Sequence, residues 1–183
     1  NYSFDAFAFG TVASPYDAYR FAKGEAIEHP AGFDVRLRAP LDFYAVTDHA
    51  MFLGAVKEAA DTTTEFSRYD HVQGLHNLNA PENQNFDSIP DRGAAFTTFL
   101  PDTLAKVGDG SIDPDLVNQI AKDAWSDTIR AAEAFNDPGN FTTFVAYEFT
   151  SSTDDRGNLH RNVIFQGADR LPAMPFSRFH SQN

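Results

Sequence analysis

A short apolar segment that stops abruptly at a polar pair constrains the fold of this chain more than any other feature. Residues 41–47 are nearly all apolar, and Asp48 and His49 follow at once. A strand that is covered on both faces has such an apolar run, so we predict a central buried strand here. A second apolar run, Phe141–Phe149, carries Glu148 near its end. Because catalytic side chains in α/β proteins usually lie at the carboxyl ends of strands, these two strand ends predict a functional site.

Predicted helices alternate with the predicted strands. The pair Ser14-Pro15 begins a helix that ends at Gly24, with the serine as N-cap and the proline in the first turn. Residues 61–91 are polar and rich in Asn, Asp and Pro, and we interpret them as a surface insertion in a single domain. The other predicted elements are a hairpin or loop over 25–40, helices over 50–60, 93–106 and 113–135, and a strand over 159–165. The strand–helix–strand order favours an α/β fold with parallel strands.

Composition excludes several classes of partner and of chemistry. The formal net charge is −12 and the pI is about 4.7, whereas nucleic-acid binders usually have a basic face, so we expect no nucleic-acid partner. We also expect no membrane partner, because the chain is acidic and no apolar run reaches the roughly 18 residues that span a bilayer. The absence of cysteine excludes disulfides, thiolate catalysis and cysteine-bound zinc. Any metal must therefore be held by His, Asp and Glu.

Four residues are candidate metal ligands: Asp5, His49, Glu148 and His160. Imidazole and carboxylate ligands together suit zinc, iron or manganese, whereas magnesium and calcium prefer oxygen alone. A carboxylate such as that of Glu148 can bridge two metal ions, and two ions about 3.5–4 Å apart can activate water and hold the oxygens of a phosphoryl group. Each residue taken alone has a structural alternative, such as a turn residue for His49 or a half-buried strand residue for His160.

Two further residues next to these candidates have a functional and a structural interpretation. Asp48 can orient His49 or its neighbour through a hydrogen bond, or it can cap the following helix. Arg161, next to His160, is a candidate for binding an anionic group of a substrate, and an exposed strand arginine is the simpler alternative. We count Glu148 and Asp48 as candidate catalytic residues and Arg161 as a candidate substrate-binding residue.

The sequence resembles the DUF3604 family, which is similar to the polymerase and histidinol phosphatase (PHP) superfamily of metal-dependent phosphoesterases. The segments that carry the resemblance are Tyr2-Ser3-Phe4-Asp5-Ala6, residues 17–24, residues 40–50 through Thr47-Asp48-His49, Tyr147-Glu148-Phe149-Thr150, and Gly157-Asn158-Leu159-His160-Arg161. The resemblance implies a partial, distorted (β/α)7 barrel over residues 1–183, with mostly parallel strands and a site for three metal ions at their carboxyl ends. The expected ions are divalent: zinc, manganese or iron.

The resemblance also implies a role for each candidate ligand. Asp5 and His49 would share one metal ion, Glu148 would bridge the other two, and His160 would bind one of those two. The implied reaction is the attack of a metal-bound hydroxide on a small anionic ester of the phosphate type, and a sulfate or phosphonate ester is a related substrate. A metal-dependent amidohydrolase and a degenerate, non-catalytic binding domain are the alternatives.

Some ligands of the superfamily have no counterpart in this sequence. Its opening His-x-His pair would precede Asn1, and its later His and Asp-x-His would follow Asn183. We therefore expect an internal piece of a larger enzyme, truncated at both ends, that binds metal weakly and is inactive alone. Family members with signal peptides favour an exported bacterial protein over a cytoplasmic one.

Overall fold

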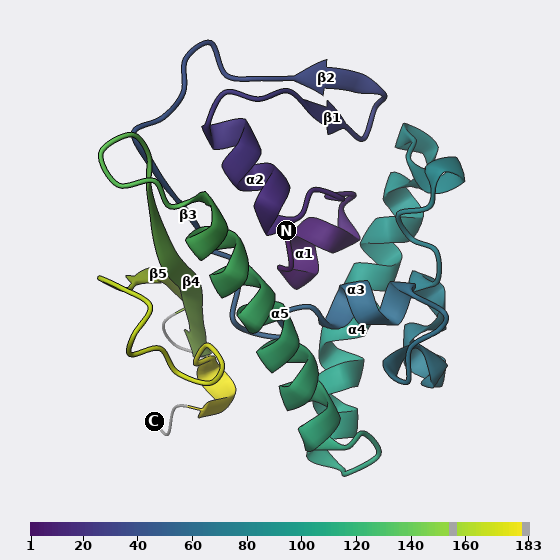
Figure 1. Ribbon diagram of the computed structural model, residues 1–183. Helices are drawn as coiled ribbons and strands as arrows, with labels where there is room; N and C mark the ends of the chain where they lie inside the picture. Colours follow the sequence, from purple (N-terminus) through teal and green to yellow (C-terminus); the bar gives the residue numbers. More distant parts are fainter. Residues whose placement is uncertain (154–156, 181–183) are drawn as a thin grey trace.

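The largest sheet of the computed structural model has three strands (Figure 1). The structure describes residues 1–153 and 157–180. Strand β3 (Phe43–Val46) pairs in parallel with β4 (Thr142–Thr153), which pairs antiparallel with β5 (Gly157–Ile164). A separate antiparallel hairpin consists of β1 (Ile27–His29) and β2 (Phe33–Val35). The predicted strands and the predicted hairpin therefore exist, within a small α/β fold.

The predicted partial (β/α)7 barrel with mostly parallel strands is wrong. The described residues contain no barrel, and among their strand pairs only β3 and β4 are parallel. The lengths of the connections explain this. The long connection from β3 to β4 includes several helices, but only residues 154–156 separate β4 from β5. Because a parallel crossover needs about a dozen residues or more, so short a connection forces an antiparallel pair.

Two amphipathic helices pack on one face of the sheet: α2 (Pro15–Ala22) and α5 (Pro114–Phe135). The ring of Tyr19 in α2 lies 5.9 Å from that of Tyr44 in β3, and Trp125 in α5 lies 5.8 Å from Tyr147 in β4. Since successive side chains in a strand point to opposite faces, Glu148, next to Tyr147, points to the other face of the sheet.

Hydrogen bonds at their first residues explain where these two helices begin. Ser14 and Asp17 form a reciprocal capping box ahead of Pro15, as the predicted start of α2 requires. The Asp113 side chain accepts a hydrogen bond from the backbone N–H of Asp115 at the start of α5. Both helix predictions are confirmed.

No helix in the part of the chain that the structure describes is long and apolar enough to cross a membrane.

A second apolar core lies away from the sheet, where the first half of α5 meets other helices (Figure 1). These are α1 (Phe4–Ala8), α3 (Ala55–Ala60), α4 (Ile89–Gly108), and the short 3₁₀ helices η1 (Phe66–Arg68) and η2 (Asp70–Leu75). Two more 3₁₀ helices, η3 (Pro81–Asn83) and η4 (Phe86–Ser88), follow in the chain before α4. Another 3₁₀ turn, η5 (Arg178–His180), lies near the end of the described chain. The helix predicted over 50–60 is shorter than expected, because residues 51–54 form turns.

The segment 61–91 is more than the surface insertion that its polar composition predicts. Phe66, Val72, Leu75 and Leu78 are all buried in the second core, and Tyr69 packs against it. These five residues recur at every third position, which is the period of a 3₁₀ helix and not of an α-helix. An apolar stripe is therefore present in the sequence, at a spacing that a search for a period of 3.6 residues misses.

One arginine joins α4 to the segments around it. Arg92 is 3% exposed, and its guanidinium donates five hydrogen bonds. The acceptors are the backbone oxygens of Ala8, Leu78 and Asn83, at 2.6–3.1 Å, and the side-chain oxygens of Asn79 and Ser88, at 2.7 and 3.0 Å. Arg92 thus joins α1 and the segment 61–91 to α4. None of these five acceptors is a carboxylate.

A half-buried histidine of η2, His71, contacts α4 through its side chain. The Nε2 atom of His71 lies 3.0 Å from the Thr103 hydroxyl, and its Nδ1 atom is buried without a hydrogen-bond partner among the described residues. Burial lowers the pKa of His71, and the positive charge of Lys106 lowers it further. The imidazole therefore binds a proton more readily in the unfolded chain than in the folded one.

This difference predicts that acid destabilises the fold through His71. As the pH falls below the pKa of an unfolded histidine, about 6.5, proton binding favours the unfolded chain by at most about 1.4 kcal/mol per pH unit. In the variant H71Q, whose amide can contact Thr103 but does not titrate, we expect a smaller loss of unfolding free energy between about pH 7.5 and 5.5. Urea denaturation at several pH values measures both losses, and equal losses would contradict the prediction.

Candidate metal centre

The backbone pairing of β3 with β4 continues beyond β3 and places His49 beside Glu148. The two residues form a parallel bridge. The N–H of Ala50 donates to the Glu148 carbonyl and the N–H of Glu148 donates to the Asp48 carbonyl, both at 2.9 Å. The two apolar runs of the sequence therefore deliver His49 and Glu148 to one place, although Glu148 lies in the middle of β4 and not at its end.

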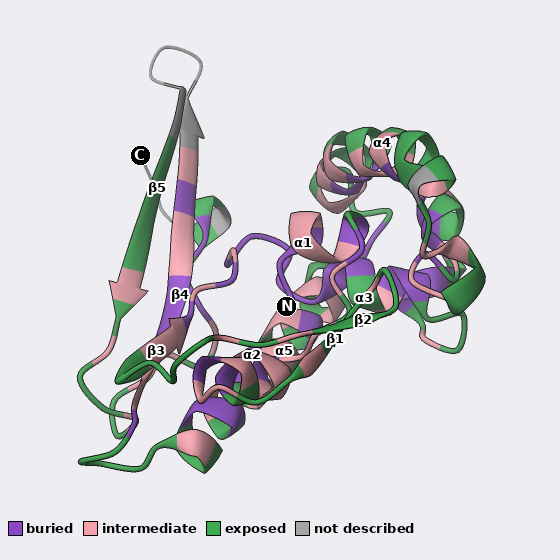
Figure 2. Cartoon of the chain, turned by 90° about the horizontal axis from the view of Figure 1, so that it is seen from above, coloured by how far each residue is buried: buried purple, intermediate pink, exposed green. Residues whose placement is uncertain are grey.

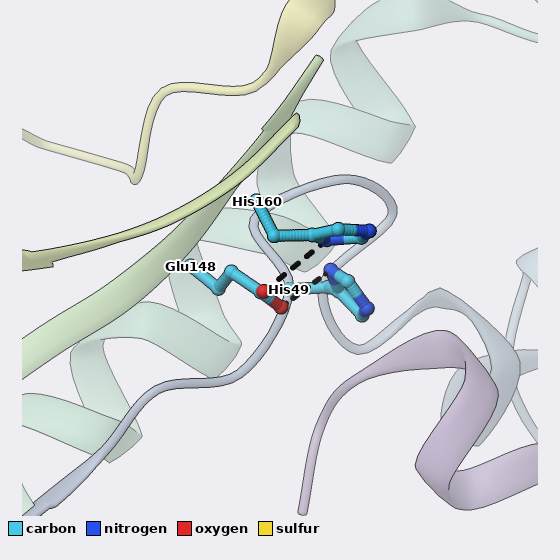
Figure 3. A group of neighbouring side chains, drawn as sticks. All are labelled: His49, Glu148 and His160. Atoms are coloured by element: carbon cyan, nitrogen blue, oxygen red, sulfur yellow. Dashed lines mark ion pairs between the residues drawn. The ribbon is translucent and has the colours of Figure 1, made fainter. Parts of the chain in front are cut away.

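Strand β5 adds the second histidine. His160 lies directly opposite Thr150 in the antiparallel register, two residue pairs away from the pair of Glu148 with Asn162. Because residues opposite each other in antiparallel strands share a face, His160, Thr150 and Glu148 all point to the same side of the sheet. Figure 3 shows the two imidazoles next to each other, with a dashed line from each to the Glu148 carboxylate.

Short distances join the charged atoms of this cluster. The Nδ1 atom of His49 lies 2.9 Å from Glu148 Oε2, and the Nδ1 atom of His160 lies 3.2 Å from Glu148 Oε1 (Figure 3). On the other side of the His49 ring, Nε2 lies 3.3 Å from Asp5 Oδ2 in α1. One ligand atom from each of His49, Glu148 and His160 lies within 4.8 Å of the others. The structure thus brings all four predicted metal ligands together.

The contact between His49 and Asp5 raises the pKa of His49 and lowers the pKa of Asp5. The hydrogen bond with Asp5 raises the pKa of His49, burial opposes this effect, and the charges of Asp5 and Glu148 add to it. Burial favours a higher pKa for Asp5, but the hydrogen bond with His49 and the charge of its ring outweigh burial and lower that pKa. The site therefore favours a positive charge between Asp5 and Glu148.

The cluster is open to solvent on one side. The His160 side chain is 46% exposed, against 14% for His49 and 21% for Glu148. Figure 2 shows exposed residues along much of β5 and more deeply buried ones along β4. A small ion or molecule can therefore approach the cluster from the side of His160, while His49 and Glu148 are held more firmly within the fold.

Asp48 lies next to this cluster in sequence, but its carboxylate points toward the start of the chain. It accepts hydrogen bonds from the Tyr2 N–H, at 2.8 Å, and from the Ser3 hydroxyl, at 3.0 Å. The Ser3 oxygen in turn accepts a hydrogen bond from the His49 N–H at 2.8 Å. Asp48 thus orients the backbone of His49 through Ser3. The residue before α3 is Gly54, so Asp48 does not cap that helix.

Arg161 is the predicted site residue that does not join the cluster. It follows His160 in β5 and pairs with Phe149, so its side chain projects from the opposite face of the sheet. Two polar residues that contact the histidines of the cluster, Thr150 and Ser3, are not among the predicted site residues. For Thr150 a signal was present, because it follows Glu148 by two residues in a strand and therefore shares its face. Ser3 contacts the site only through tertiary structure.

The Asp48–Ser3 contacts predict a loss of stability when the carboxylate is removed. In the variant D48A the buried N–H of Tyr2 and hydroxyl of Ser3 lose their acceptor, which typically costs about 1–3 kcal/mol. The exposed Asp42 offers a matched control, and D42A should change the unfolding free energy by no more than about 0.5 kcal/mol. Chemical denaturation of both variants tests this, and a D48A variant as stable as D42A would refute the role given to Asp48.

One protein family matches the chain over its full length. The family model is that of DUF3604, described as a protein of unknown function, and the match covers residues 1–183. It therefore includes all four residues of the cluster. No curated protein and no solved structure matches the chain.

Proposed function

We propose that this chain, which belongs to the DUF3604 family, binds divalent metal ions for the hydrolysis of phosphate-type esters. The observation that supports the proposal is the arrangement of His49, with a carboxylate on each side of its ring and with His160 sharing one of them. We also propose that the family is related to the PHP phosphoesterases, because the Thr-Asp-His sequence and the paired strand carrying Glu148 both contribute to this cluster.

The donor atoms fit zinc, manganese or iron. The cluster offers imidazole nitrogen and carboxylate oxygen, and these ions accept both, whereas the chain has no thiolate to offer. Two ligand atoms bound to one tetrahedral zinc ion at about 2.0–2.1 Å lie roughly 3.3 Å apart. The Nε2 atom of His49 and the Oδ2 atom of Asp5, which lie 3.3 Å apart, already have this separation.

Charge explains why an anionic ester would need the metal at this site. The side chains of Asp5 and Glu148 are both acidic, and the formal net charge of the chain is −12. An anionic ester is therefore repelled until cations reverse the local potential. When bound, the metal ions supply that charge and lower the pKa of a water molecule.

Each residue of the site has a distinct task in this proposal. Asp5, His49, Glu148 and His160 hold the ions. Asp48 accepts a hydrogen bond from the Ser3 hydroxyl, whose oxygen accepts one from the backbone N–H of His49 and so fixes its position. The half-exposed His160 leaves the open side on which the ester can approach. Arg161 takes no part, because it lies on the other face of the sheet.

The proposal predicts that metal content depends on His49. Elemental mass spectrometry on the chain, purified without chelators and then loaded with zinc or manganese, should find bound metal in the parent and little in H49A. The exposed His29 in the hairpin provides the control, and H29A should bind as much metal as the parent. Equal metal content in H49A and the parent, or none in the parent, would refute a metal site at this cluster.

The reaction class is tested by the hydrolysis of bis(p-nitrophenyl) phosphate by the full-length protein and its H49A variant. A metal-dependent rate that falls at least about 10–100-fold in H49A would support the phosphoesterase, since even outer partners of a metal ligand typically contribute that much. Turnover of an amide substrate without any phosphodiester hydrolysis would favour a metal-dependent amidohydrolase instead. Bound metal without turnover of either substrate would favour a binding domain.

A further inference from the structure

A buried hydroxyl lies between the two histidines of the cluster. Thr150 is 7% exposed, and its Oγ1 atom lies 2.9 Å from the Nδ1 atom of His49 and 3.1 Å from that of His160. It is the residue directly opposite His160 in the sheet, and it follows Glu148 by two residues in β4. The hydroxyl therefore reaches the same nitrogen of both rings.

The chemistry of a hydroxyl allows it to hold both rings in one protonation pattern. A hydroxyl oxygen can accept two hydrogen bonds, and a neutral imidazole carries its proton on one nitrogen and leaves the other bare. If Nδ1 of each ring donates to Thr150, then Nε2 of each ring is bare and can bind a cation. In His49 the Nε2 atom is the one that faces Asp5.

Glu148 becomes a poorer acceptor for these rings once it binds an ion, because the ion draws on the same carboxylate oxygens. Its two oxygens lie 2.9 and 3.2 Å from the same Nδ1 atoms and can accept from them in the free protein. When these oxygens serve as ligands, another acceptor for the Nδ1 protons is favourable, most of all for the more deeply buried His49, because a buried donor without a partner is costly. Thr150 is placed to accept from both.

We propose that Thr150 is a positioning residue of the metal centre, whose hydroxyl keeps the Nε2 atoms of His49 and His160 free to bind metal. This inference rests on the proposed function, since it assigns Thr150 a role toward the same ions. Outer partners that orient ligating imidazoles typically contribute 10–100-fold to metal affinity. A role of this kind distinguishes Thr150 from a residue that merely fills space in β4.

The test compares T150V, T150S and T142V. Valine has nearly the shape of threonine and suits a strand, but it lacks the hydroxyl, whereas serine keeps it. Thr142 begins the same strand, away from the cluster, so T142V makes the same change where no effect is expected. The first measurement is the affinity for Co²⁺, followed by its visible absorption, with the metal-free melting temperature as a check on folding.

We expect T150V to bind Co²⁺ about 10–100-fold more weakly than the parent, and T150S and T142V to stay close to it. Equal affinity in T150V and the parent would overturn this inference alone. A T150S variant as weak as T150V would overturn it too, because the methyl group and not the hydroxyl would then matter. A parent that binds no Co²⁺ would overturn the proposed function, and this inference with it.

A second measurement needs no metal. Nitrogen-15 NMR of the metal-free protein, at a pH where the imidazoles are neutral, reports which ring nitrogen carries the proton. We expect Nδ1–H on both His49 and His160 in the parent and in T150S, and a mixture of the two forms in T150V. The same protonation pattern in T150V and the parent would show that the hydroxyl does not set it, and would refute the proposal.

Discussion

The parallel pairing of β3 with β4 is the constraint on which the rest of the structure depends. It joins segments about a hundred residues apart in sequence, and its hydrogen bonds continue past Val46 to the bridge between His49 and Glu148. A shift of one residue in this register would turn one strand's side chains to the opposite face and separate the two residues. The same pairing sets which side chains of the sheet meet α2 and α5, and which remain for the cluster.

Local patterns in the sequence are enough to predict most of the helices and strands. Some signals act within a few residues, so the element they begin or end can be inferred without tertiary structure. Examples are the apolar run that ends at Asp48, and the helix caps Ser14 and Asp113. Asp5, His49, Glu148 and His160 were predicted as one group, partly from the resemblance to a family, and the structure brings them together. Whether they bind metal stays a prediction.

The features that were missed or wrong depend on geometry over longer distances. The barrel, which the family resemblance implied, is wrong, because only residues 154–156 join β4 to β5 and so short a connection makes the pair antiparallel. The core contribution of the segment from Phe66 to Leu78 was missed because its stripe has a period of three. The link from Asp48 through Ser3 to His49 joins the first residues to a strand end, and no local pattern reveals such a contact.

Arg92 has a consequence for how the molecule responds to its ionic surroundings. All five hydrogen bonds of its guanidinium end on uncharged oxygen atoms within the fold. Dissolved salt weakens attraction between opposite charges, most of all where they face water, but it has little effect on buried bonds to neutral acceptors. The attachment of α4 to α1 should therefore persist in brine, where surface pairs such as Arg130 with Asp127 are screened.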